Sequence, residues 1–477
     1  MTTPSSERTG NGLALLANKC ASRTFDISSG MVYASMRDQI VRAQLLIRDL
    51  KRCDPSCDRV LIVGAGVAGI VAAVCARSLG LETLVVESNS TAFQLQTGVH
   101  RRMVGPFMYE WPSILSTAQS YPPVANLLGQ AIDVTPTWDA AHPISAHDFA
   151  ERLFAWYISL SLIHPPLQVI YNCDRKKIRD YVQEFVNVHS RLTSAGSKSN
   201  SPATPFPENP SFKPDYVILA VGTGTERVHL IDGTEDDAKS VKGEPFWKDD
   251  DLRNEPKMEW NVGVFGGGDG ALQDVLRLIT KFDHPLLFIE QLKKGKGNIA
   301  KQINDLMPAL ETLEQQSRLY ATWSAGSIYD LIDAECERIC TTLAARPGVI
   351  VKVCEQIREG DGTVRLVHRG DHFGKAYLLN RFCLHLIEKC LPPGRLPGKI
   401  TYQRLQNMSA STAFTDSAGV HIVELSNGEM LRLDKVVVRF GPSQDELRQR
   451  QLVKLHPDTQ ADRTSMASIP LPFTVAE

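Results

Sequence analysis

Short apolar runs, each ended by a glycine or a charged residue, recur along this chain of 477 residues. Residues 60–63 and 83–86 form one pair of such runs, and residues 262–265 and 285–289 form a second pair. Runs of this length without polar alternation are typical of strands buried on both faces of a parallel sheet. Between the two runs of each pair lies a longer segment, rich in apolar residues, that is predicted to be a helix. The pattern therefore predicts two β-α-β units.

The first strand leads directly into a glycine-rich turn, VGAGVAG, at residues 63–69. The first glycine of such a turn permits a tight bend, the second lets the backbone approach a pyrophosphate, and the third allows close helix packing. The following helix presents free amides and a positive dipole end to the phosphates. An acid at the end of the next strand is placed to accept hydrogen bonds from a ribose. The predicted dinucleotide-binding residues are Gly64, Ala65, Gly66, Val67, Ala68, Gly69 and Glu87.

Residues 265–274, FGGGDGALQD, repeat this design and fill the G-x-G-x-x-A positions. The apolar run 285–289 is predicted to be the next strand, and it ends at Glu290. A carboxylate there favours NADH, because it accepts from a 2′-hydroxyl and repels a 2′-phosphate. The lysines of KKGKG, just beyond, would instead reach the 2′-phosphate of NADPH, so both nucleotides remain open. The predicted cofactor-binding residues of this turn are Gly266, Gly268, Asp269, Ala271 and Glu290.

A second repeated pattern, found once after each glycine turn, supports the duplication. Residues 214–224, PDYVILAVGTG, and residues 433–442, LDKVVVRFGP, each place an aspartate before an apolar run that ends at glycine. We expect each run to return as a strand to the sheet of its own unit. Gly222 is a further candidate for cofactor binding.

The chain resembles the flavoprotein oxidoreductases with two dinucleotide-binding domains, a superfamily that includes thioredoxin reductases and flavin monooxygenases. The residues that carry the resemblance are VGAGVAG with Glu87, VILAVGTG at residues 217–224, and FGGGDGALQD at residues 265–274. The resemblance implies FAD in the first unit and NADH or NADPH in the second. The chemistry would then be that of the cofactor, which the protein binds and orients.

The resemblance also implies roles for the segment TGVHRRMVGPFMYEWPSILS, at residues 97–116, which passes beside the pyrophosphate and the flavin in related proteins. Arg101 or Arg102 is expected to pair with phosphate through its planar guanidinium, or else to face solvent. Tyr109 and Trp111 are candidates for a substrate pocket, with packing of the loop as the alternative. Asn380, in a predicted helix over residues 376–390, either faces this pocket or makes a structural hydrogen bond.

The predicted fold class is α/β, with two Rossmann-like dinucleotide-binding units built on parallel sheets and an N-terminal helical extension. An amphipathic helix is expected in residues 31–52, and short β-type runs, GVIVKVC, HIVELS and VVVRF, are expected within residues 348–440. The predicted domains are the extension (1–57), an FAD-binding domain (58–258), an NAD(P)-binding domain with helical insertions (259–442) and a C-terminal tail (443–477).

Composition narrows the class of protein. An apolar fraction of 43%, a charged fraction of 22% and a net charge of −2 are typical of a globular protein that binds neither nucleic acid nor an anionic membrane. No apolar run reaches the roughly 18 residues of a membrane span, and no secretory signal is recognisable. The ten cysteines lie mostly in apolar segments, which indicates free thiols and a cytoplasmic location. No metal-binding spacing and no CxxC motif occurs, which argues against a dithiol-transferring reductase.

The sequence therefore predicts an FAD-dependent oxidoreductase that takes a hydride from NAD(P)H and passes electrons to oxygen or a small organic substrate, as monooxygenases do. One alternative is a non-catalytic nucleotide sensor or scaffold, because the final T-x-G-D segment of the family is not recognisable after Asp434. Another is an amine or amino-acid oxidase in which the second turn is vestigial. The substrate and the oligomeric state are not assigned.

Overall fold

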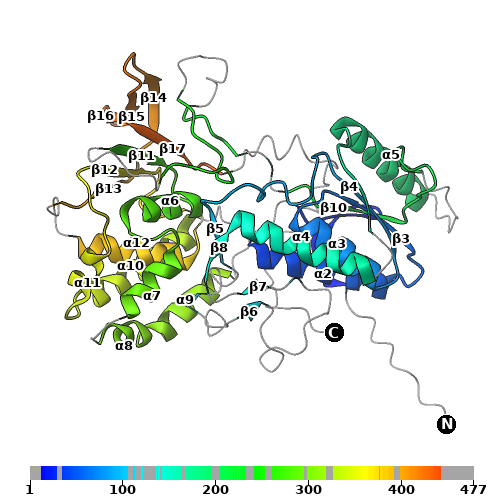
Figure 1. Cartoon of the computed structure of the whole chain (residues 1–477), viewed down its shortest axis with the longest axis horizontal. Coiled ribbons are helices and arrows are strands. Elements are labelled where there is room, and N and C mark those ends of the chain that lie inside the picture. Colours follow the sequence, from blue (N-terminus) through cyan, green and yellow to red (C-terminus); the bar gives the residue numbers. More distant parts are fainter. Residues whose placement is uncertain are drawn as a thin grey trace, which may run out of the picture.

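The chain folds around two parallel sheets, which lie towards opposite ends of the molecule in Figure 1. The computed structural model describes residues 12–28, 35–105, 111–112, 120–121, 136, 138–139, 142–163, 167–194, 205–222, 224, 226–231, 241–252, 260–294, 298–318, 326–374, 376–391 and 398–441. The α/β class with two Rossmann-like units, predicted from the sequence, is confirmed.

The first sheet has six strands, and every neighbouring pair is parallel except the first. In sheet order the strands are β1 (Lys19–Ala21), β2 (Thr24–Asp26), β10 (Tyr216–Leu219), β3 (Arg59–Val63), β4 (Glu82–Val86) and β9 (Gln168–Ile170). The N-terminal extension is therefore not only helical, as expected, because it contributes β1 and β2. Phe25 of β2 is buried in the core of this unit, which explains why a strand forms here.

Helices cover both faces of the first sheet. One face packs against α2 (Met36–Cys53), α3 (Val67–Ser78) and α4 (Ala146–Ile163), and the other against α5 (Arg175–Ser194). Val60 and Ile62 of β3 are buried towards the first group, whereas Leu61 and Val63 are buried towards α5. This alternation explains why β3 is apolar at successive positions. The amphipathic helix predicted in residues 31–52 is α2. A short helix, α1 (Leu13–Asn18), precedes β1.

The second sheet consists of four parallel strands. In sheet order they are β13 (Thr401–Leu405), β12 (Thr363–Val367), β11 (Asn261–Phe265) and β17 (Lys435–Val438). One face packs against helices. The other packs against an antiparallel sheet of β14 (Ala410–Thr415), β15 (His421–Leu425) and β16 (Met430–Leu433), seen at the upper left of Figure 1.

Between β11 and β12 lie the crossover helix α6 (Asp269–Ile279) and a long helical insertion. The helices of the insertion are α7 (Pro285–Lys293), α8 (Ile299–Asn304), α9 (Met307–Arg318), α10 (Gly326–Ala344) and α11 (Val349–Glu355). The strand predicted for the run GVIVKVC is wrong, because this run forms most of helix α11. HIVELS and VVVRF lie in β15 and β17, as expected. The helix predicted over residues 376–390 is α12 (Leu378–Cys390).

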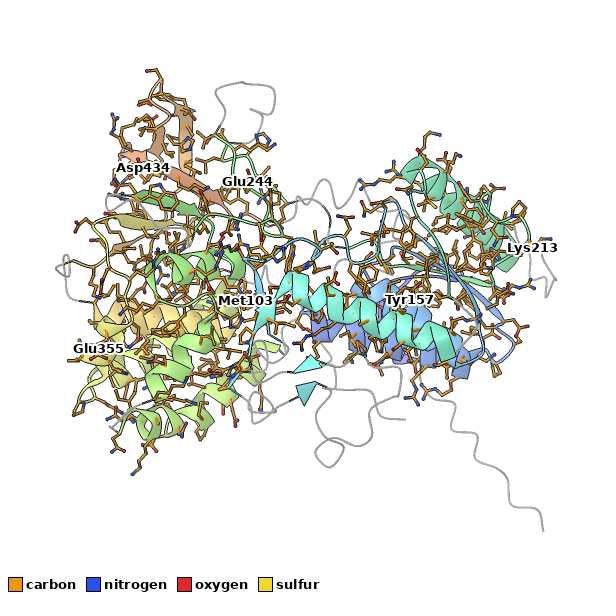
Figure 2. All side chains as sticks on the ribbon, viewed as in Figure 1. Met103, Tyr157, Lys213, Glu244, Glu355 and Asp434 are labelled. Atoms are coloured by element: carbon orange, nitrogen blue, oxygen red, sulfur yellow. The ribbon has the colours of Figure 1, made fainter. Side chains whose placement is uncertain are left out.

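Two pairs of very short strands lie in the segment between β4 and α4. Strand β5 (Met103–Val104) pairs with β8 (Ile144–Ser145), and β6 (Ser120–Tyr121) pairs with β7 (Trp138–Asp139). In Figure 2, Met103 lies between the two units. None of the helices in the described parts of the chain combines the length and the apolar character that a membrane crossing requires.

The two returning strands are held in the same way, as the repeated sequence predicts. Strand β10 pairs in parallel with β3, and β17 pairs in parallel with β11. Asp215, before β10, accepts a hydrogen bond from the amide of Arg59 at 2.9 Å. Asp434, before β17, accepts one from the amide of Asn261 at 2.7 Å. The duplication seen in the sequence is therefore a duplication of structure.

Candidate functional site

The first glycine turn connects β3 to α3, as predicted. Gly64 has φ +107°, and a Cβ on it would lie 2.3 Å from the carbonyl oxygen of Ala220. A Cβ on Gly69 would lie 1.9 Å from the carbonyl oxygen of Gly64. These two glycines are required for the turn to pack against β10 and α3. The position of a Cβ on Gly66 has no atom within 4 Å, so this glycine borders open space.

The open space at Gly66 lies at the start of α3. Gly66 is the N-cap residue of this helix, and no side chain caps it. Amides of the first turn of a helix have no partner within the helix, and they favour an anion. Ala65, Val67 and Ala68 line this turn, with backbones that follow the predicted β-α connection. The arrangement fits a diphosphate held by backbone amides.

Glu87 directly follows β4, where the sequence places it, and only 8% of its surface is exposed. Its Oε2 accepts a hydrogen bond from the amide of Ala65 at 2.7 Å. Its Oε1 accepts from the amide of Asn89 at 2.7 Å and from Asn89 Nδ2 at 2.8 Å. A carboxylate has about four lone-pair sites, so Oε2 retains the capacity to accept from a ribose hydroxyl. The acid thus also ties the turn to the segment that follows β4.

Gly222 lies just beyond β10, at the same edge of the sheet. It adopts φ +78°, and a Cβ on it would meet no atom within 4 Å. The neighbouring Val221 is 45% exposed. The amide of Ala220 donates to the carbonyl of Val63 at 2.8 Å, which brings this turn beside the first glycine turn. Gly222 therefore lies in the region where the sequence predicts cofactor binding.

The second glycine turn has the same construction. The amide of Gly266 donates to the carbonyl of Val367 at 2.9 Å, as the amide of Gly64 donates to that of Val86 at 2.8 Å. Gly266 has φ +140°, and a Cβ there would lie 2.4 Å from a backbone oxygen. Gly268 is the N-cap residue of α6, and Ala271, in its first turn, is buried.

Asp269, the first residue of α6, faces the segment before α12. Its Oδ1 accepts from the amide of Tyr377 at 3.0 Å and from Asn380 Nδ2 at 2.6 Å. Asn380 is fully buried, so it does not face a substrate pocket. Its side chain makes a structural hydrogen bond with Asp269, as the alternative prediction stated. The assignment of Asn380 to a pocket is therefore corrected.

The strand predicted over residues 285–289 is wrong, because these residues form α7. Pro285 occupies the first helical turn, and His284 caps the helix by accepting from the amide of Leu286 at 3.2 Å. Proline is favoured at this position since its missing amide is not needed there. Glu290 consequently lies within a helix, 37% exposed and 3.8 Å from His142 Nδ1. The geometric reason for assigning it to a ribose is lost.

The strand that follows α6 in the sheet is β12, and it ends in a basic segment that sequence reasoning missed. His368 takes the place that Glu87 takes in the first unit. The amide of Glu87 donates to Ile170, and the amide of His368 donates in the same way to Leu405. Arg369 follows and is exposed. The signal was present in TVRLVHRG, an apolar run followed by two basic residues.

His368 is almost fully buried beside the second glycine turn. A Cβ on Gly267 would lie 3.2 Å from the Cβ of His368. Arg404 Nε donates to His368 Nε2 at 2.9 Å. Burial, together with the charge of Arg404, lowers the pKa of His368 to about 4. The imidazole is therefore neutral at pH 7. The positive charge at this strand end comes from Arg369 and Arg404.

Arg102 does not face the phosphates of the first turn, which corrects the expectation for this residue. Its guanidinium is buried, forms an ion pair with Asp274 of α6, and lies 2.9 Å from Asp250. Arg101 is exposed, and its amide donates to Asp249 at 2.8 Å. Of the two arginines, Arg101 is the one whose side chain stays at the surface.

The aromatic candidates also differ from expectation. Tyr109 lies outside the described residues. Trp111 is 3% exposed, and its ring lies 5.0 Å from that of Phe382 of α12, within the core of the second unit. Trp111 thus packs a segment of the first half of the chain onto the second unit, which is the alternative to a place in a substrate pocket.

Comparisons with known proteins give a distant likeness. No family model and no curated protein matches the chain. Among solved structures, a bacillithiol disulfide reductase from Staphylococcus aureus is 12% identical, with a TM-score of 0.34 over 84% of this chain and 80% of that one. A thioredoxin reductase from Lactococcus lactis is 11% identical, with a TM-score of 0.36 over 86% and 96%. A histamine dehydrogenase from Rhizobium sp. 4-9 is 11% identical, with a TM-score of 0.30; this chain spans 46% of it. At such values the fold assignment depends on the strand order and glycine turns described above.

Proposed function

We propose that this protein is a flavin-dependent oxidoreductase that binds FAD at the first glycine turn and NADPH at the second. The observation that carries the proposal is the duplicated turn. Strands β3 and β11 are each followed by a glycine with positive φ, Gly64 or Gly266, and each turn leads into a helix through a glycine that no side chain caps. Such turns are suited to the pyrophosphate of a dinucleotide.

The two strand ends differ in charge, and this difference supports one nucleotide for each turn. Glu87 offers a carboxylate to an unphosphorylated ribose, as in FAD. At the corresponding place the second unit has His368, followed by the exposed Arg369. An arginine at this strand end accommodates a 2′-phosphate, whereas a carboxylate repels it. The nearby acid Asp371 has its carboxylate engaged by Asn407 Nδ2. NADPH is therefore preferred over NADH.

The cysteines argue against a dithiol as the electron acceptor. Most of those in the described residues are buried, and burial raises the pKa of Cys57, Cys75 and Cys390 to about 12. Thiols with such pKa values form little thiolate at pH 7 and are poor nucleophiles. FAD, held by the first glycine turn at Gly66 and by Glu87, would supply the transfer of electrons from NADPH to oxygen or to a small organic acceptor. A monooxygenase-like reaction fits this pattern.

The test is steady-state oxidation of NADPH and NADH, measured together with oxygen consumption, by protein reconstituted with FAD. We expect a kcat/KM for NADPH at least about tenfold above that for NADH, because one charge-assisted contact contributes roughly 1.5–3 kcal/mol. Protein that retains no flavin after reconstitution would contradict the proposal. A preference for NADH would overturn the assignment of the basic strand end.

A further inference from the structure

The segment that follows β12 closes onto the second glycine turn. The amide of Gly374 donates to the carbonyl of Gly267 at 2.8 Å. In the first unit, the amide of Phe93 donates to the carbonyl of Ala65 at 3.0 Å. Each nucleotide turn is therefore covered by the segment that leaves the neighbouring strand. Residues 368–374, together with residues 376 and 377, are called here the covering loop of the second turn.

The two covering segments are held by carboxylates from different places. In the first unit, Glu87 at the strand end binds both the turn, through Ala65, and the covering segment, through Asn89. His368 occupies this place in the second unit and supplies no carboxylate. The acid that binds the covering loop comes instead from the helical insertion. Asp333 of α10 accepts from the amide of Phe373 at 2.9 Å.

Arg381 of α12 extends the support from Asp333 along the loop. Its Nη1 donates to Asp333 Oδ1 at 2.7 Å and to the carbonyl of Phe373 at 3.0 Å. Its Nε donates to the carbonyl of Ala376 at 3.0 Å, and its Nη2 to that of Gly374. One guanidinium thus binds three carbonyl groups of the loop. The planar fork of arginine is suited to such multiple contacts.

Asp333 and the two side chains that pair with it most closely, Arg381 and His385, are buried. Asp333 and His385 have no exposed surface, and Arg381 is 1% exposed. His385 Nε2 lies 2.9 Å from Asp333 Oδ1 and Arg404 Nη2 lies 3.9 Å from Oδ2, so with Arg381 the carboxylate has three cationic partners. Burial acts to raise the pKa of Asp333, but the hydrogen bond from His385 and the charge of Arg381 hold it well below its usual range. Because its cationic partners balance the charge of Asp333, this carboxylate supports the loop without placing a net negative charge next to it.

We propose that Asp333 is a positioning residue for the 2′-phosphate of the second nucleotide. Acting through Arg381 and the amide of Phe373, it holds the covering loop so that Arg369 is presented at the end of β12. The helical insertion then contributes to the nucleotide site indirectly. Its residue Asp333 contacts the covering loop and not the glycine turn. This inference rests on the proposed function, because it assigns NADPH to the second turn.

The test measures binding of adenosine 2′,5′-bisphosphate and of adenosine 5′-monophosphate by calorimetry, using flavin-loaded protein. Asp333→Asn should raise the Kd for the bisphosphate roughly tenfold, the effect expected when one charge-assisted contact with the 2′-phosphate is lost. The Kd for the monophosphate and the flavin content should remain within about twofold, since Asp333 binds the loop at Phe373 and the substitution changes no residue of either glycine turn. Glu335→Gln on the same helix is the matched control, because Glu335 pairs only with the exposed Arg338 in the described contacts.

Asp333→Asn leaves two buried cations with a weaker partner, and such a change is strongly destabilising. Arg381→Lys therefore provides a second variant, which keeps the charge next to Asp333 and loses the fork that binds the loop carbonyls. The same selective loss of bisphosphate binding is expected. Bisphosphate affinity that is unchanged in the folded variants overturns the inference alone. Wild-type protein that binds neither ligand overturns the proposed nucleotide function as well.

Discussion

Arg102 and Asp274 form a buried ion pair that joins the two halves of the chain. Arg102 belongs to the segment after the first β-α-β unit, and Asp274 lies on the helix that starts at the second glycine turn. Asp274 also accepts from Arg439 Nε at 2.7 Å and lies 3.1 Å from Arg277 Nη1. Burial acts to raise the pKa of Asp274, but the three arginines hold it well below its usual range.

Asp274→Asn should destabilise the protein by about 3–5 kcal/mol, because it leaves buried arginines without their shared carboxylate. The measurement is the free energy of unfolding in urea. Glu82→Gln, which removes an exposed ion pair with Arg59, is the control and should give no measurable change. A loss of stability that is equal in the two variants would show that the buried cluster has no special role.

Gly66→Ala separates folding from cofactor binding. A methyl group at this position meets no protein atom within 4 Å, so the fold should tolerate it. The same methyl would occupy the space where a diphosphate approaches the backbone. We expect unchanged thermal unfolding of the apoprotein and a Kd for FAD raised about tenfold or more, or 1.4 kcal/mol.

Gly64→Ala is the contrasting variant, because its Cβ would lie 2.3 Å from the carbonyl oxygen of Ala220. It should lower the stability of the apoprotein itself. If Gly66→Ala binds FAD as the wild-type protein does, the open space beside α3 does not hold the diphosphate.

Arg369→Gln should raise the KM for NADPH roughly tenfold or more and leave the KM for NADH nearly unchanged. The reason is the loss of a charge-assisted contact with the 2′-phosphate, which contributes roughly 1.5–3 kcal/mol. Glu290→Gln is the matched variant, and it should alter neither value because Glu290 lies within α7. An effect of Glu290→Gln on NADH, with none of Arg369→Gln on NADPH, would restore the original assignment.

Three buried histidines make stability depend on pH in opposite directions. Burial alone would lower the pKa of His385, but its hydrogen bond with Asp333 and the carboxylate of Glu388, 3.4 Å from Nδ1, raise it to about 9. The ordinary value is about 6.5, so the folded protein holds a proton that the unfolded chain loses between these values. The stabilisation from His385 is complete below about pH 6.5 and is lost as pH rises towards about 9, by up to roughly 1.4 kcal/mol per unit.

Burial lowers the pKa of His284 to about 3, and burial with the charge of Arg404 lowers that of His368 to about 4. These two groups lower stability as pH falls below about 6.5, because the unfolded chain then binds more protons. Urea unfolding at several pH values tests this. His385→Gln should abolish the alkaline part of the dependence and leave the acidic part. An alkaline slope that is equal in both proteins would contradict the assigned charge of His385.

The parallel strands and the glycine turns could be predicted from sequence because the signals are local. A four-residue apolar run followed at once by glycine fixes both the strand and the bend, and the aspartates at 215 and 434 mark the returning strands. The place of Glu87 directly after β4 could be predicted for the same reason, since this residue lies close to its turn along the chain.

The basic residues at the end of β12 could not be predicted by spacing, because the insertion separates α6 from β12. The run at residues 285–289 lies at the expected distance and is apolar, yet Pro285 and the cap at His284 begin a helix there. Short apolar runs do not distinguish a buried helix from a buried strand by periodicity alone. The roles of Arg102 and Asn380 depend on partners far along the chain, Asp274 and Asp269, which no local pattern reveals.

The most direct measurement is the absorbance of the purified protein during an anaerobic titration with NADPH. Two glycine turns that bind two different nucleotides predict an oxidised-flavin band that disappears as NADPH is added, and that responds much less to the same concentrations of NADH. A protein without the flavin band after reconstitution with FAD, or a band that neither nucleotide changes, would contradict the assignment of a donor and an acceptor to the two turns.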